Sequence, residues 1–140
     1  MPVRYKRMRN PRWSESRCWR RGQVPGGLLD WLLDSGSLTD RLKQACPGGF
    51  SVRVLDEGWA RPRLDEWLAL DMPLHAVGWV RQVQLLCRGK PWVFARTVVP
   101  ATTLSGPQRQ LAHLGNRPLG SFLVAAPGMQ RGPGELHRLR

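Results

Sequence analysis

Acidic residues, cysteines and long apolar runs are all scarce in this chain of 140 residues. Only 10 Asp and Glu stand against 22 Lys and Arg, which gives a formal net charge of +12. No run of about 18 apolar residues occurs, so we expect no membrane-spanning helix. The three cysteines form no CxxC pair and no Cys/His cluster with metal-ligand spacing, so we also expect no metal site.

The cysteines themselves are odd in number and widely spaced, at Cys18, Cys46 and Cys87. This usage differs from the dense, even-numbered cysteine pattern of small secreted domains. We therefore expect all three to be reduced, without a structural or catalytic role, in a cytoplasmic protein.

Positive charge is concentrated at the N-terminus, where residues 1–22 contribute +7 of the +12. Such an arm can bind RNA or anionic lipid, but no recognition helix, RNP-like strand or zinc-finger spacing accompanies it. We expect residues 1–24 to form a flexible basic arm. Nucleic acid is not an expected partner.

After the boundary at Pro25-Gly26-Gly27, helical and strand patterns alternate in a way that indicates an α+β fold. We expect residues 25–124 to form one domain and residues 125–140 a Gly/Pro-rich basic tail with no packing face. Residues 119–124 fit either a strand or a short helix. The other expected helices cover 28–34, 37–46, 64–70 and 105–114, and we expect Ser37 and Ser105 to be N-caps of the second and the fourth. The expected strands cover 50–56, 76–87 and 91–99.

Arg81 is the most informative single residue. The segment around it alternates like a half-buried strand, and Arg81 falls on the face that carries Trp79, Val83 and Leu85. Because an arginine stays charged, a position among core residues requires an anionic partner. Either a carboxylate of this chain or a bound ligand supplies that charge.

A second arginine raises the same question. If a two-residue turn near Gly89 joins the strands, Arg96 lies on the face of Arg81, whereas a three-residue loop reverses this parity. Two guanidinium groups on one inward face repel each other unless an anion lies between them. Residues 76–99 contain no Asp or Glu, so a ligand carrying carboxylates would satisfy both arginines. The alternative is an edge strand whose arginines face solvent.

Four blocks between residues 28 and 120 carry a resemblance to a known family. They read LLDWLLDSGSLTDRL (28–42), VRVLDEG (52–58), WVRQVQLLCRGKPWVFARTVVP (79–100) and TLSGPQRQLAHLGNRPLG (103–120). In order and spacing they resemble the chorismate pyruvate-lyases. The combination of PW, RTVVP, LSGP and LG-x-x-PLG is specific to that family.

The resemblance implies a single α+β domain in which short helices flank a twisted antiparallel sheet and helical flaps cover a buried pocket for an aromatic acid. It implies elimination of pyruvate from chorismate to give 4-hydroxybenzoate for ubiquinone synthesis. Aromatisation of the ring drives that reaction, so the resemblance implies no metal and no organic cofactor. We expect a monomer whose partners are chorismate and 4-hydroxybenzoate.

The resemblance also assigns substrate-binding residues. Arg81 matches the arginine that pairs with the ring carboxylate. Leu38 matches a ligand-contacting position in a flap, and Leu119 matches a position that lines the pocket through its backbone. Arg96 follows from the hairpin argument instead, either in the pocket or on the access route of the second carboxylate.

Two departures from the family pattern bear on catalysis. Gln82 stands where relatives often carry an acidic residue. The family's glutamate, which meets the ring hydroxyl, belongs to a later strand that lies beyond Arg140, and Glu135 does not match it. We therefore identify no catalytic residue, and expect a C-terminally shortened chain that lacks the last strand region and binds better than it turns over. The alternative function is a non-catalytic effector-binding domain of the same fold.

Overall fold

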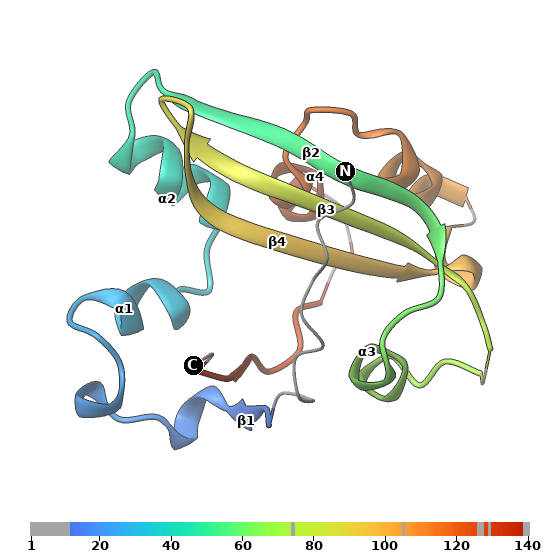
Figure 1. Cartoon of the computed structure of the whole chain (residues 1–140), viewed down its shortest axis with the longest axis horizontal. Helices are drawn as coiled ribbons and strands as arrows, with labels where there is room; N and C mark the ends of the chain where they lie inside the picture. Colours follow the sequence, from blue (N-terminus) through green and yellow to red (C-terminus); the bar gives the residue numbers. More distant parts are fainter. Residues whose placement is uncertain (1–11, 74, 105, 126–127, 129, 139–140) are drawn as a thin grey trace. The chain divides into compact units, whose positions relative to one another are not determined.

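The computed structural model describes residues 12–138 apart from 74, 105, 126, 127 and 129. The chain forms two compact units, one of Ser37–Met129 and one of Met1–Gly36 with Gln130–Arg140. Each unit combines an antiparallel sheet with short helices (Figure 1). The expected α+β class is confirmed.

The larger unit is built on a three-stranded antiparallel sheet of β2 (Phe50–Ala60), β3 (Gly78–Cys87) and β4 (Lys90–Pro100). The strand order is β2-β3-β4, so the strand that carries Arg81 has a neighbour on both sides. Both expected strands of the hairpin are confirmed, and β2 runs four residues beyond the expected end at 56.

Short helices complete this unit, and all except η3 lie in segments where a helix was expected or left open. They are α2 (Leu38–Ala45), α3 (Leu64–Ala69), the 3-10 helices η3 (Ala101–Thr103) and η4 (Gly106–His113), and α4 (Leu119–Ala125). Ser37 begins α2 by accepting a hydrogen bond from the Asp40 N–H at 3.2 Å. Residues 119–124 are helical, which settles that alternative. The expected cap at Ser105 lies outside the described residues.

The turn between β3 and β4 has two residues, Arg88 and Gly89, both with positive φ. A bulge between Leu85 and Leu86 nevertheless shifts the register by one residue. The bulge leaves Arg81 opposite Thr97 instead of Arg96. The prediction that the two arginines share a face is wrong, because one extra residue reverses the parity of every residue beyond it.

A second bulge in β2 decides which carboxylate meets Arg81. The register between β2 and β3 shifts between Val54 and Asp56, so Glu57 pairs with Arg81. Without that shift, Asp56 would stand opposite Arg81 and the Glu57 side chain would project from the other face. The bulge thus selects Glu57 as the cross-strand neighbour.

A hydrophobic cluster of this unit lies on the face of β3 that carries Arg81. Val99, Leu111 and Leu114 form a buried cluster, against which Trp79, Leu104, Leu119, Phe122 and Leu123 pack. Because Val99 stands opposite Trp79 in the register, η4 and α4 cover this face of the sheet. The face is therefore shielded from water at its Val99 end.

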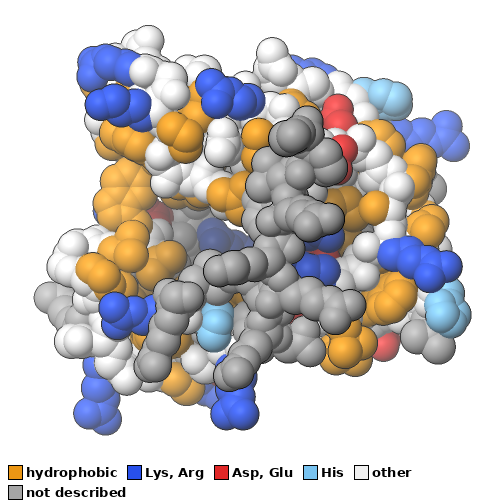
Figure 2. Space-filling model, viewed as in Figure 1, with side chains coloured by type: hydrophobic (Ala, Val, Ile, Leu, Met, Phe, Trp, Pro, Cys, Tyr) orange, Lys and Arg blue, Asp and Glu red, His pale blue; other side chains and the backbone are white. Residues whose placement is uncertain are grey.

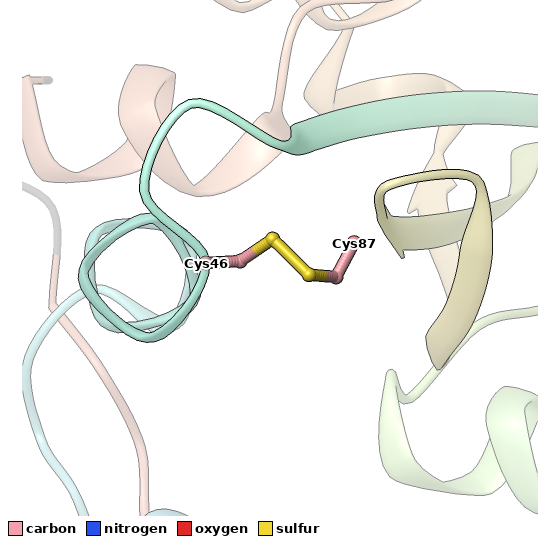
Figure 3. Close-up of a disulfide and its surroundings, with 2 residues drawn as sticks. All are labelled: Cys46 and Cys87. Carbon is pink, nitrogen blue, oxygen red and sulfur yellow. A yellow bond between two sulfur atoms is a disulfide. The ribbon is translucent and has the colours of Figure 1, made fainter.

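A disulfide joins Cys46, the C-cap of α2, to Cys87 at the end of β3 (Figure 3). Both residues are buried, with 1% and 7% of their surface exposed. The prediction that all cysteines are reduced is wrong for this pair, whereas Cys18 is free and exposed. The two cysteines are 41 positions apart in the sequence, and only the fold brings their Cα atoms to 5.9 Å. The pairing could therefore not be predicted from the sequence pattern.

The smaller unit contains β1 (Ser14–Glu15), η1 (Ser16–Cys18), η2 (Arg21–Gln23), α1 (Leu28–Leu32) and β5 (Glu135–Leu136). β1 and β5 pair antiparallel, so the prediction that the tail has no packing face is wrong. A pocket of about 270 Å³ opens between them and α1, lined by residues that include Trp13, Trp19 and Leu28. Among the described residues, no helix is long and apolar enough to cross a membrane.

Candidate functional site

Arg81 is buried on the central strand, with only 3% of its surface exposed. Its Nη1 donates to Glu57 Oε2 at 3.0 Å and its Nη2 donates to the backbone oxygen of Arg117 at 3.0 Å. The alternative of an edge strand with a solvent-facing arginine is therefore wrong for Arg81. The prediction that Arg81 requires an anionic partner is confirmed. The chain supplies one, from β2 rather than from residues 76–99.

The contacts of Arg81 with described residues do not use every N–H donor of its guanidinium. A guanidinium has five N–H groups, and the two contacts between described residues use two of them. Glu57 is also the less buried partner, with 27% of its side chain exposed. Glu57 thus fixes the orientation of Arg81 and supplies the anion that its burial requires.

The fold brings the three sequence-predicted residues into one neighbourhood. Arg117, whose carbonyl accepts from Arg81, lies two residues before Leu119 at the start of α4. A Cβ on Gly120 would lie 3.1 Å from Thr39 Oγ1, so the start of α4 abuts the start of α2, where Leu38 lies. The loop that accepts a hydrogen bond from Arg81 therefore leads into the start of α4, and the start of α4 lies beside the start of α2.

That loop is itself held by a side chain. The Arg117 guanidinium donates to the carbonyls of Leu114 at 3.1 Å and His113 at 2.9 Å. These contacts satisfy carbonyls at the end of η4 and fix the peptide whose oxygen meets Arg81. Leu119 packs on the buried cluster, whereas Leu38 is 42% exposed.

Arg96 belongs to the other face of the sheet. Its Nε and Nη2 donate to the two carboxylate oxygens of Glu66 in α3, at 2.8 and 2.9 Å. The backbone N–H of Arg63 donates to Glu66 as well, at 2.8 Å. Arg96 thus holds α3 by a bidentate ion pair, and its proposed place beside Arg81 in the pocket is not supported by the register.

The same contacts set the ionisation of Glu66. Burial by itself raises the pKa of Glu66, but the hydrogen bonds from Arg96 and Arg63, together with their positive charges, outweigh it and hold the pKa below its ordinary value. The hydrogen bond to Glu66 also raises the pKa of Arg96. Both shifts favour the charged pair in the folded protein.

We expect the Glu66–Arg96 pair to make unfolding depend on pH. Because the pKa of Glu66 is lowered on folding, its contribution is complete above the ordinary glutamate value of about 4.3 and is lost as pH falls through the folded value. Glu66→Gln should lower the free energy of unfolding by about 1–3 kcal/mol at pH 7. Urea denaturation from pH 3 to 7 measures the free energy of unfolding of both proteins. A difference between variant and parent that stays the same at every pH would contradict the prediction.

The profile of the chorismate lyase family matches residues 10–140. This chain belongs to the chorismate lyase family. Three relatives named "Probable chorismate pyruvate-lyase" illustrate the similarity. The protein of Marinobacter nauticus is 44% identical over 111 residues (79% of this chain, 59% of the relative), that of Pseudomonas aeruginosa strain PAO1 46% over 115 (82% and 65%), and that of Methylococcus capsulatus 50% over 99 (71% and 61%).

The chain spans about three fifths of the length of these curated chorismate lyase relatives. Within the part of the chain that the structure describes, no group of three or more His, Cys, Asp or Glu is placed to hold a metal ion. On the face shown in Figure 2, Lys and Arg side chains lie in several separate places with hydrophobic and other side chains between them.

Sequence reasoning missed Glu57, the cross-strand partner of Arg81, and the carbonyl of Arg117. Glu57 lies within the quoted block VRVLDEG, yet the expected strand ended at Asp56. Its pairing with Arg81 depends on the bulge between Val54 and Asp56 in β2, and no residue pattern in this strand predicted that bulge. The contact with Arg117 involves a backbone atom, so no side-chain motif could have indicated it.

Proposed function

We propose that this protein acts as a chorismate pyruvate-lyase, which converts chorismate to 4-hydroxybenzoate and pyruvate. In this reaction the C3–O bond of the ring breaks and the enolpyruvyl group leaves. The proton at C4 is lost as the ring aromatises, and the leaving group takes up a proton to become pyruvate. Gain of aromaticity drives the elimination, so the protein's task is to bind and orient the substrate.

The observation that carries the proposal is the buried guanidinium of Arg81, oriented by Glu57 and by the loop that leads into α4. A fixed cation shielded from water binds a carboxylate more strongly than one on the surface. In the proposal, Arg81 anchors the ring carboxylate of chorismate. Leu38 and Leu119, at the two helix starts, shape the pocket around the ring.

A coupled assay tests the reaction. Purified protein is incubated with chorismate, pyruvate is followed through lactate dehydrogenase and NADH, and 4-hydroxybenzoate is quantified by chromatography. Equal amounts of both products, formed above the spontaneous rate, are the expected result. Pyruvate without 4-hydroxybenzoate would contradict the proposed elimination.

Binding is measured in parallel, because the prediction that residues 1–140 bind better than they turn over stays a prediction. Titration with 4-hydroxybenzoate should give a saturable signal. Binding without any turnover would favour the alternative, a ligand-binding domain of the same fold. Absence of both would contradict the proposed function altogether.

The cytoplasmic location and the monomeric state belong to the proposal as well. Cys46 and Cys87 are paired, so the cysteines give no support for a cytoplasmic location. The location therefore rests on the proposed reaction in ubiquinone synthesis. Size-exclusion chromatography with light scattering tests the monomer, for which the sequence mass is 15.9 kDa.

A further inference from the structure

One buried polar group on the strand of Arg81 has no hydrogen-bond partner in the part of the chain that the structure describes. The indole N–H of Trp79 is shielded from solvent, and no hydrogen-bond acceptor for it exists among the described residues. Buried tryptophan N–H groups ordinarily find an acceptor, because leaving the donor unpaired costs stability.

The position of Trp79 connects it to the candidate site. Trp79 and Arg81 are two residues apart on β3 and project from the same face, with their Cα atoms separated by about 7 Å. Trp79 also packs against the cluster of Val99, Leu111 and Leu114, to which Leu119 contributes. Trp79 therefore lies on the same face as Arg81 and packs against the cluster that the start of α4 also covers.

The ring of Trp79 is held on more than one side. Trp59 stands opposite it in the register, and the two indoles meet edge to face with ring centroids 5.5 Å apart. The buried cluster contacts it as well. A donor on a ring restrained in this way is oriented before any ligand arrives, which favours recognition of one acceptor position.

We propose that the Trp79 indole N–H donates a hydrogen bond to the ring carboxylate of the ligand that Arg81 anchors. This makes Trp79 a specificity-determining residue, and it rests on the proposed function. A carboxylate has two oxygens that accept several hydrogen bonds, so one oxygen can meet Arg81 while the other meets Trp79. Because protein atoms now cover the N–H, the ligand reaches it through a local movement of the covering groups.

The inference is tested by replacing the indole N–H without changing the shape of the ring. 3-Benzothienylalanine, which carries sulfur in place of the N–H, is incorporated at position 79, and Trp79→Phe serves as a second variant. The probes are benzoate and 4-hydroxybenzoate, and their dissociation constants are measured by calorimetry. Thermal unfolding is recorded for each protein.

We expect the isostere at position 79 to weaken both probes about 10-fold, the loss typical of a hydrogen bond to a charged group. The melting temperature should not fall, since the donor that is removed had no partner among the described residues. The same isostere at Trp67 is the matched control, because that indole N–H donates to the Ala76 carbonyl at 3.0 Å. There we expect a lower melting temperature and unchanged dissociation constants.

Three outcomes would overturn the inference. Unchanged affinity for both probes would show that Trp79 does not donate to the ligand. A loss confined to 4-hydroxybenzoate would assign the hydrogen bond to the ring hydroxyl instead of the carboxylate. If the unmodified protein binds neither probe, the proposed function fails and this inference fails with it, a result distinct from the other two.

Discussion

Arg81→Ala is expected to weaken binding of 4-hydroxybenzoate by about 30-fold or more, since truncating one partner of a buried charge pair costs about 2–5 kcal/mol. The side chain is only 3% exposed, so water does not compete for it as it does for a surface arginine. Loss of the guanidinium leaves the ligand carboxylate without its cation in a poorly hydrated place. Calorimetric titration measures the change.

Arg81→Lys separates charge from geometry. Lysine keeps the positive charge but lacks the planar fork that contacts Glu57 and the Arg117 carbonyl at the same time. We expect an affinity between those of the parent and Arg81→Ala. In turnover assays, both variants should raise KM for chorismate.

Arg96→Ala is the matched control for Arg81→Ala. Arg96 is also a shielded arginine in a strand and is paired with a glutamate, but it lies on the opposite face of the sheet. Its loss should lower stability and leave the dissociation constant within about 2-fold of the parent, because no ligand contact is removed. Equal affinity losses for both arginine variants would argue against a specific anchoring role of Arg81.

Removal of the disulfide is expected to lower the free energy of unfolding by about 4 kcal/mol, from the chain-entropy estimate for a loop of this length. The bond links positions 41 residues apart and ties the end of α2 to the end of β3. The comparison is between the parent and a Cys46→Ala/Cys87→Ala double variant, by urea denaturation without reductant.

Two controls isolate the bond from the side chains. Cys18→Ala changes an exposed, free cysteine and should leave stability unchanged. Dithiothreitol should destabilise the parent towards the double variant and leave the double variant itself unaffected. A parent that does not respond to reductant, together with two titratable thiols at Cys46 and Cys87, would contradict the bond.

Local patterns in the sequence were sufficient for most elements of the larger unit. Alternation of apolar residues gave the strands of the hairpin, the serine at position 37 gave the start of α2, and proline and glycine marked the breaks. Each of these signals arises from residues close together in the chain. The family membership likewise follows from the four blocks between residues 28 and 120.

The sequence indicated that Arg81 needs an anionic partner, but not which group supplies the charge. An arginine among core residues needs an anion whatever the fold, so the need was visible without coordinates. The identity of the anion was not, because Glu57 reaches Arg81 only through a bulge in the neighbouring strand. The same limit applies to Arg96. The bulge between β3 and β4 places Arg96 on the other face of the sheet, where it forms an ion pair with Glu66.

What the sequence determined by itself was the α+β class, the family, and the requirement for an anion at Arg81. Only the tertiary structure decided the registers, the Cys46–Cys87 bond, the β1–β5 pairing and the unpaired N–H of Trp79. The physical reason is that each of these depends on residues distant in the chain. Their meeting is fixed by one-residue shifts and by packing that no local pattern records.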